Sequence, residues 1–129
     1  MSRPDAKTVL VVDDEQDILD LVAITLEDEG FSVNTASNGL EALDAVKRQM
    51  PDLILLDMKM PVMDASEFAR EFHLRYGYST PILMLTAMDD VGSRAKLLGA
   101  IGWIGKPFDL DDLAASVKRI NREEQDHRP

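Results

Sequence analysis

The stretches Thr8-Val9-Leu10-Val11-Val12 and Leu53-Ile54-Leu55-Leu56 are short apolar runs rich in Val, Ile and Leu, without alternating polar residues. Residues 81–85 form a third such run and residues 101–104 a weaker fourth. Runs of this kind are typical of strands buried on both faces of a parallel sheet. Residues 31–36 alternate between apolar and polar, which predicts an edge strand with one face in water.

Segments with helical spacing separate these five predicted strands. Their apolar residues recur at helical intervals near 18–26, 40–46, 66–76, 90–98 and 110–120. Asp109 is the expected N-cap of the last helix. Strand and helix therefore alternate five times, which predicts an α/β fold: a doubly wound parallel sheet with right-handed crossovers and helices on both faces.

Length and charge limit the function classes. The chain has 129 residues and a formal net charge of −10, so one domain is expected. Such acidity disfavours direct binding of nucleic acid or of an anionic membrane, both of which need clustered Lys and Arg. The absence of cysteine excludes disulfides and thiolate metal sites. With no apolar stretch long enough to span a membrane and no signal peptide at the start, a cytoplasmic protein is expected.

Polar residues stand at or near the ends of four predicted strands: Asp13-Asp14, Asp57, Thr86 and Lys106-Pro107. The carboxyl ends of parallel strands meet at one edge of the sheet, where ligands bind in open α/β folds. Three carboxylates brought together repel one another, and hard oxygen ligands without nearby His or Cys favour Mg²⁺ or Mn²⁺ over zinc. Asp57 is then a candidate nucleophile toward phosphorus, while Lys106 and Thr86 could contact phosphoryl oxygens.

Each residue also has an ordinary structural interpretation. The Asp-Asp pair could cap a helix, Asp57 could belong to a turn, Thr86 could cap the next helix, and Lys106-Pro107 could be a loop. Taken singly, these interpretations are the more common ones. Their joint occurrence at the same end of four strands favours a site.

The segments 9–15, 51–64, 81–87 and 99–108, in this order and spacing, resemble the receiver domain of two-component response regulators. The resemblance runs from about Lys7 to Arg122. It implies a flavodoxin-like (βα)₅ fold of strand order 2-1-3-4-5, with a receiver domain at 7–122 and flexible termini at 1–6 and 123–129.

The resemblance also implies a role for each residue of the motifs. Asp57 would be the phosphoacceptor, Thr86 the switch hydroxyl, Lys106 the lysine that contacts the phosphoryl group, and Trp103 the switch aromatic. The Mg²⁺ ligands would be Asp13, Asp14, Asp57 and the backbone carbonyl of Lys59. The Lys106-Pro107 peptide bond would be cis, against a base rate of about 5–6% for X-Pro bonds.

Two residues depart from the family pattern. Ala65 stands where the family usually has Gly, so the loop must either do without easy access to positive φ or take a different local course. Trp103 replaces a more common Tyr or Phe, and its larger ring makes a swing between orientations bulkier. A partly buried packing residue is an equally good interpretation of Trp103.

The function implied is a signalling receiver that takes a phosphoryl group from a histidine kinase or phosphotransfer protein and is not a turnover enzyme. Its switching face would be the fourth helix, fifth strand and fifth helix, acting on a protein target, on an output domain outside this chain, or in a phosphorylation-dependent homodimer. One alternative is a receiver-like binding module that works without phosphorylation. Another is an aspartyl-phosphate phosphatase, disfavoured because Lys59 stands where such enzymes carry their general acid.

Overall fold

A single parallel sheet organises the chain. The computed structural model describes residues 7–58, 60, 62–87 and 99–126. Its sheet has five strands in the order β2-β1-β3-β4-β5, which confirms the predicted order and the flavodoxin-like fold. The strands are β1 (Thr8–Val12), β2 (Ser32–Ala36), β3 (Leu53–Asp57), β4 (Ile82–Ala87) and β5 (Gly102–Lys106).

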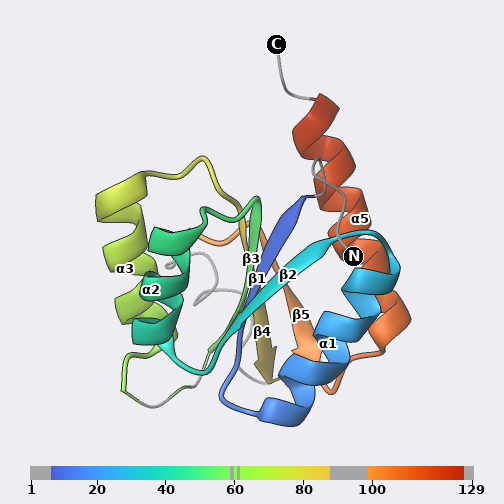
Figure 1. The fold of residues 1–129 in the computed structure, drawn as a ribbon, viewed down its shortest axis with the longest axis horizontal. Coiled ribbons are helices and arrows are strands. Elements are labelled where there is room, and N and C mark those ends of the chain that lie inside the picture. Colours follow the sequence, from blue (N-terminus) through green and yellow to red (C-terminus); the bar gives the residue numbers. More distant parts are fainter. Residues whose placement is uncertain (1–6, 59, 61, 88–98, 127–129) are drawn as a thin grey trace.

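Helices cover both faces of the sheet. Those described are α1 (Gln16–Asp28), α2 (Gly39–Arg48), α3 (Ala65–Tyr76) and α5 (Leu110–Asp126). Figure 1 shows α2 and α3 over one face and α1 and α5 over the other. The helix predicted at 90–98 lies outside the described residues, as does the N-terminal segment 1–6. Among the described helices, none combines the length and the apolar character that crossing a membrane requires.

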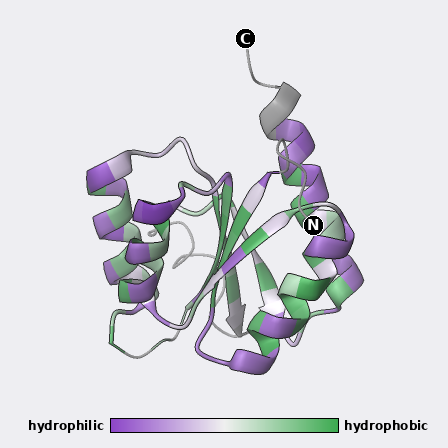
Figure 2. Ribbon diagram, in the orientation of Figure 1, coloured by the Kyte–Doolittle hydropathy of each residue, from purple (hydrophilic) through white to green (hydrophobic). Residues whose placement is uncertain are grey.

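The core lies in two layers, one on each side of the sheet. Phe68 and Phe72 of α3 are fully buried against the β3 and β4 side chains Leu56 and Met84. On the opposite face, Leu113 and the rest of the α5 apolar stripe pack with α1 on the alternate side chains of the same strands. Hydrophobic residues accordingly concentrate in the strands and on the inner helix faces (Figure 2). Burying each large side chain contributes about 1.5–3 kcal/mol, so both helix layers are held firmly to the sheet.

Side-chain caps fix where three helices begin. The Asp109 carboxylate accepts hydrogen bonds from the backbone N–H groups of Asp111 (2.8 Å) and Asp112 (3.3 Å), which confirms its predicted capping role. Asn38 and Asp64 cap α2 and α3 in the same way. Each cap satisfies backbone donors that the first helical turn leaves unpaired.

The structure adds detail at the end of α5 and in the loop before α3. The helix α5 continues through Asp126, beyond the apolar spacing that predicted it over 110–120. Ala65 is the buried first residue of α3, and the left-handed backbone of the preceding loop falls instead on Val62, with φ of 69°. The loop thus places its positive φ three residues before Ala65, on a β-branched side chain for which that conformation is strained.

Candidate functional site

The polar residues predicted to converge are brought together at the carboxyl edge of the sheet. Asp57 ends β3 and Lys106 ends β5, while Asp13 directly follows β1. Val12 pairs with Leu56 in the β1–β3 register, so the next residues along the two strands, Asp13 and Asp57, are neighbours. Parallel pairing therefore places carboxylates that are distant in sequence side by side.

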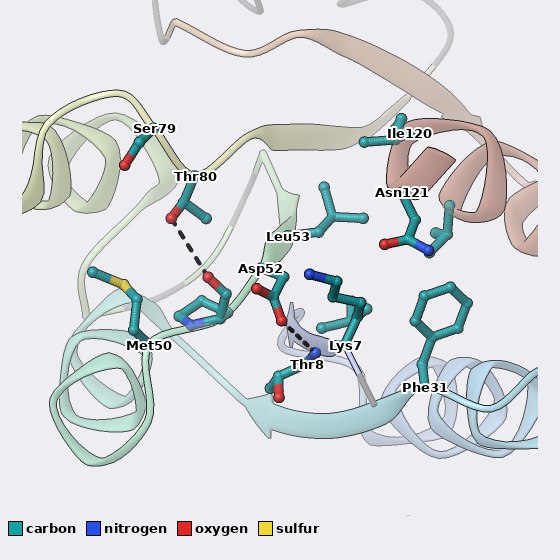
Figure 3. A pocket seen from close by; sticks show the side chains of 13 residues that line it. Lys7, Thr8, Phe31, Met50, Asp52, Leu53, Ser79, Thr80, Ile120 and Asn121 are labelled. Carbon is teal, nitrogen blue, oxygen red and sulfur yellow. Dashed lines mark hydrogen bonds between the residues drawn. The ribbon is translucent and has the colours of Figure 1, made fainter. Parts of the chain in front are cut away.

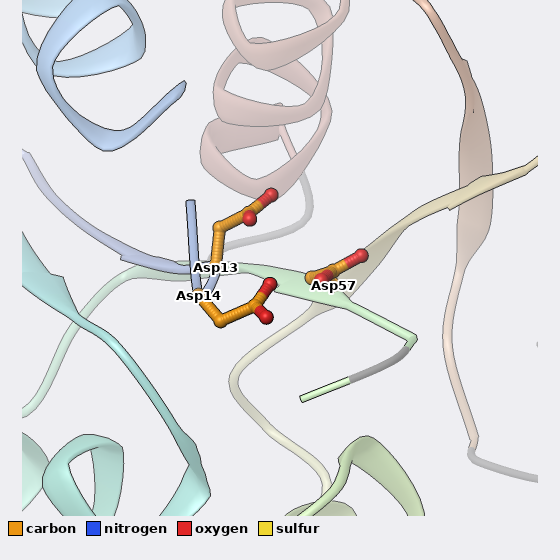
Figure 4. Close-up of side chains that lie close together, drawn as sticks. All are labelled: Asp13, Asp14 and Asp57. Carbon is orange, nitrogen blue, oxygen red and sulfur yellow. The ribbon is translucent and has the colours of Figure 1, made fainter. Parts of the chain in front are cut away.

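Three aspartates form a compact acidic cluster. Asp13, Asp14 and Asp57 each offer an oxygen, and these oxygens all lie within 4.8 Å of one another. Figure 4 shows the three side chains gathered at the ends of their strands. Asp13 is fully buried and Asp57 is 6% exposed, whereas Asp14 is open to solvent. This donor set of hard oxygens suits a divalent cation such as Mg²⁺.

Lys106 links the two buried carboxylates. Its Nζ lies 2.7 Å from Asp13 Oδ2 and 3.1 Å from Asp57 Oδ1. The other Asp13 oxygen, Oδ1, accepts the backbone N–H of Glu15 at 2.9 Å, so both Asp13 oxygens have donors. These bonds hold Asp13 within the cluster, and Glu15, rather than Asp13 or Asp14, is the N-cap residue of α1.

The environment shifts the pKa values of two residues of the site, Asp57 and Lys106. Burial and the neighbouring Asp13 charge raise the pKa of Asp57 from 3.8 to about 6, against the lowering effect of Lys106. Burial alone would lower the pKa of Lys106, but its hydrogen bond to Asp13 and the charges of Asp57 and Asp13 outweigh burial and raise it. Lys106 is therefore positively charged near neutral pH, whereas ionisation of the buried Asp57 lowers the stability of the fold.

Thr86 and Trp103 occupy different surroundings. Thr86 lies buried in β4, one residue beyond Leu85, which is the register partner of Asp57. This position puts it on the strand next to Asp57 at the same edge of the sheet. Trp103 lies on the outer strand β5 and is 48% exposed, so a surface aromatic is present where a switch residue was expected.

Three further residues of the motifs bear on the site: Lys106 through its peptide bond to Pro107, Lys59 and Glu15. The Lys106-Pro107 peptide bond is cis, as predicted. Lys59, whose carbonyl was a candidate ligand, lies outside the described residues. Sequence reasoning gave Glu15 no role, yet its carboxylate lies 4.0 Å from Lys106 Nζ and its backbone N–H holds Asp13. Its position directly after the Asp-Asp pair was the available signal.

Comparisons with known proteins now identify the family. The family model for the response regulator receiver domain matches residues 9–118. The chain belongs to the response regulator receiver family. This receiver is similar to the chemotaxis response regulator CheY4 of Vibrio cholerae, with 38% identity and a TM-score of 0.81, over 89% of this chain and 98% of that one.

Other solved receivers share the same architecture. A CheY-like receiver domain protein from Methanospirillum hungatei has a TM-score of 0.86 at 27% identity, over 96% of this chain and all of that one. The receiver domain of NtrX from Brucella abortus has 34% identity and a TM-score of 0.79, over 86% of this chain and 95% of that one. A longer NtrX structure is matched over 93% of this chain but only 28% of its own length, so the receiver fold also occurs as part of larger proteins.

Proposed function

We propose that this receiver signals by accepting a phosphoryl group on Asp57 from a histidine kinase, a phosphotransfer protein or a small phosphodonor. The observation that carries the proposal is the placement of Lys106 between Asp13 and Asp57, inside the acidic cluster. Burying charged groups in this way lowers the stability of the fold. The presence of a buried carboxylate beside an ammonium and two further carboxylates therefore supports a chemical role for Asp57.

In the proposed transfer, an Asp57 carboxylate oxygen attacks phosphorus while the P–N bond to the donor imidazole breaks. The bonding electron pair leaves with the imidazole nitrogen, and an acyl phosphate forms on Asp57. Lys106 is close enough to exchange its contact with Asp57 Oδ1 for one with a phosphoryl oxygen. The Thr86 hydroxyl, on the neighbouring strand, would donate to a second phosphoryl oxygen.

The acidic cluster fits a bound Mg²⁺, with Mn²⁺ as a substitute. Asp13, Asp14 and Asp57 would hold the ion, together with the Lys59 carbonyl that the family resemblance implies. Bound there, the ion supplies positive charge to neutralise the transferred phosphoryl oxygens.

The proposed output is a change at the face of β5 and α5, to which the family resemblance adds a fourth helix that lies outside the described residues. If Thr86 follows the phosphoryl group, space opens beside β5, which carries the half-exposed Trp103. That surface would then bind a downstream protein, an output domain or a second copy of the chain. We place this signalling in the cytoplasm, and we infer no catalytic turnover beyond the receiver's own phosphorylation and dephosphorylation.

Phosphorylation with a small acyl phosphate donor tests the proposal. Intact mass spectrometry should show one added phosphoryl group that requires Mg²⁺ and is removed by hydroxylamine, which cleaves acyl phosphates. Asp57→Asn should remove the modification. The matched control is Asp44→Asn on α2, which changes an exposed aspartate that is not a member of the cluster and should leave phosphorylation intact. Wild-type incorporation by Asp57→Asn would contradict the assignment.

A phosphorylation-independent binding module is the alternative class. Such a module has no use for a complete acidic cluster bridged by a lysine, which is the feature seen here. If chelating Mg²⁺ and substituting Asp57 both leave partner binding unchanged, this alternative is preferred. A phosphatase would instead release inorganic phosphate from the donor continuously rather than retain one phosphoryl group.

A further inference from the structure

A cavity lies at the opposite end of the sheet from the acidic cluster. It has a volume of about 360 Å³ and is bounded by the beginnings of β1 and β3, the segment before β4, and the later turns of α5. Figure 3 shows Lys7, Asp52, Phe31, Leu53 and Asn121 around this space. Its volume falls at the small end of the range for pockets that enclose organic ligands.

Apolar side chains line the inner part of this cavity, while polar groups form more than half of its surface. The inner part is formed by buried side chains of the core layer between the sheet and the helices α1 and α5: Val9, Phe31, Leu53, Val117 and Ile120. The apolar part of a ligand placed here would contact the small exposed portions of these side chains.

The polar rim contains donors that the fold does not use. Thr8, Asp52 and Thr80 are engaged: the Asp52 carboxylate accepts the backbone N–H of Thr8 at 2.8 Å, and the Thr80 hydroxyl donates to the carbonyl of Pro51. Lys7 and Asn121 are both partly buried. Within the described part of the chain, the Lys7 ammonium and the Asn121 side-chain amide form no hydrogen bond or ion pair.

These features define the ligand class. The Lys7 ammonium offers a positive charge and three donors, and the Asn121 amide offers two more. Asp52 stands at the same rim, and its charge would repel a dianion about twice as strongly as a monoanion. We propose that the cavity is a binding site for a small amphipathic organic monoanion, with its carboxylate or sulfonate at Lys7 and Asn121 and its apolar body against Phe31 and Leu53.

The site is independent of the phosphorylation chemistry. Its lining residues come from the amino ends of the strands, whereas Asp57 and Lys106 come from the carboxyl ends. The proposal can therefore be tested in the full chain carrying Asp57→Asn, and its failure would leave the proposed receiver function unaffected.

The experiment uses anilinonaphthalene sulfonate, an amphipathic monoanion that fluoresces in apolar surroundings. We expect saturable binding to the native chain, with NMR shifts at the backbone amides of Thr8, Asp52 and Thr80. Lys7→Gln should weaken binding about tenfold, because a charge-assisted contact is lost, and Lys7→Arg should retain it. The matched control is Lys47→Gln, an exposed lysine on α2, which should stay within about twofold of the wild type.

Two further measurements separate this site from general dye binding. Asn121→Phe should place a large ring at the rim and abolish binding, while circular dichroism checks that this variant and Lys7→Gln are folded. Octanoate should displace the dye and the neutral octanamide should not. Absence of saturable binding, equal affinity for Lys7→Gln and the wild type, or NMR shifts confined to other surfaces would overturn the proposal.

Discussion

Replacing Asp57 with asparagine should make the protein more stable at neutral pH when no divalent cation is present. The pKa of Asp57 rises from 3.8 to about 6 because its carboxylate is buried beside Asp13. Each unit by which a pKa differs between folded and unfolded states is worth about 1.36 kcal/mol, so the ionised Asp57 costs about 3 kcal/mol at pH 7. The side chain is only 8% exposed, which limits solvent screening of this cost.

The pH dependence has a definite sign. Because the folded-state pKa is raised, the neutral carboxyl stabilises the fold fully below pH 3.8, and that stability is lost as the pH rises through about 6. Asparagine does not titrate, so the free energy of unfolding of Asp57→Asn should exceed that of the wild type by up to about 3 kcal/mol at pH 7. The difference should shrink toward zero below pH 4.

Urea unfolding with a chelator present, at pH 3.5, 5 and 7 by design, measures this difference directly. For a chain of this length, about 3 kcal/mol corresponds to roughly 10 °C in Tm. Asp44→Asn is the control, since Asp44 is exposed on α2. Excess Mg²⁺ should narrow the gap, because an ion that binds the folded wild type stabilises it. Equal stability of Asp57→Asn and wild type at pH 7, or a gap as large at pH 3.5 as at pH 7, would refute the reasoning.

Three other substitutions give distinct stability changes, each measurable by urea unfolding. Without divalent cations, Lys106→Met should lower the free energy of unfolding by about 3 kcal/mol, because the carboxylates of Asp13 and Asp57 stay buried without their ammonium. Mg²⁺ should restore most of this stability. A loss that Mg²⁺ does not reduce would contradict the reasoning. Val62→Gly should raise the free energy of unfolding by about 1 kcal/mol, because glycine adopts a φ of 69° without the strain of a β-branched residue. Val62→Ala should give no comparable increase. Equal increases for the two variants would argue against backbone strain. Asp109→Ala should lose about 1 kcal/mol through removal of the α5 cap, and an unchanged midpoint would show that the cap is not stabilising.

The fold followed from the sequence because its signals are local and consistent. Apolar runs without alternation marked the central strands, and helical spacing marked the segments between them. The position of Asp109 before an amphipathic segment was enough to predict its cap, since the capping bonds are made within one turn. The end of α5 was less predictable, because the residues after Ile120 are polar and carry no apolar stripe to mark where the helix ends.

The clustering of Asp13, Asp57 and Lys106 was predictable from the sequence, whereas the energetics of the cluster and the contacts of Glu15 were not. Knowing that parallel strands share one carboxyl edge was sufficient to bring Asp13, Asp57 and Lys106 together. The raised pKa of Asp57 depends on how deeply the neighbouring layers bury it, which no local pattern reveals. Likewise, the strained φ of Val62 depends on the path that joins β3 to α3, and a β-branched residue gives no local signal for it.

The charges of the cluster explain why one lysine is not sufficient as its counter-ion. Asp13, Asp14 and Asp57 carry three formal negative charges and Lys106 carries one positive charge, which leaves a formal charge of −2 when all are ionised. The chain as a whole is already acidic, at −10, so its other groups do not neutralise this excess. Without a cation, burial and the neighbouring charge of Asp13 raise the pKa of Asp57, so part of the repulsion is relieved by protonation. In the proposed function, a divalent cation bound at the cluster would offset this repulsion, and the Asp57 carboxylate would then remain ionised and available as a nucleophile at neutral pH.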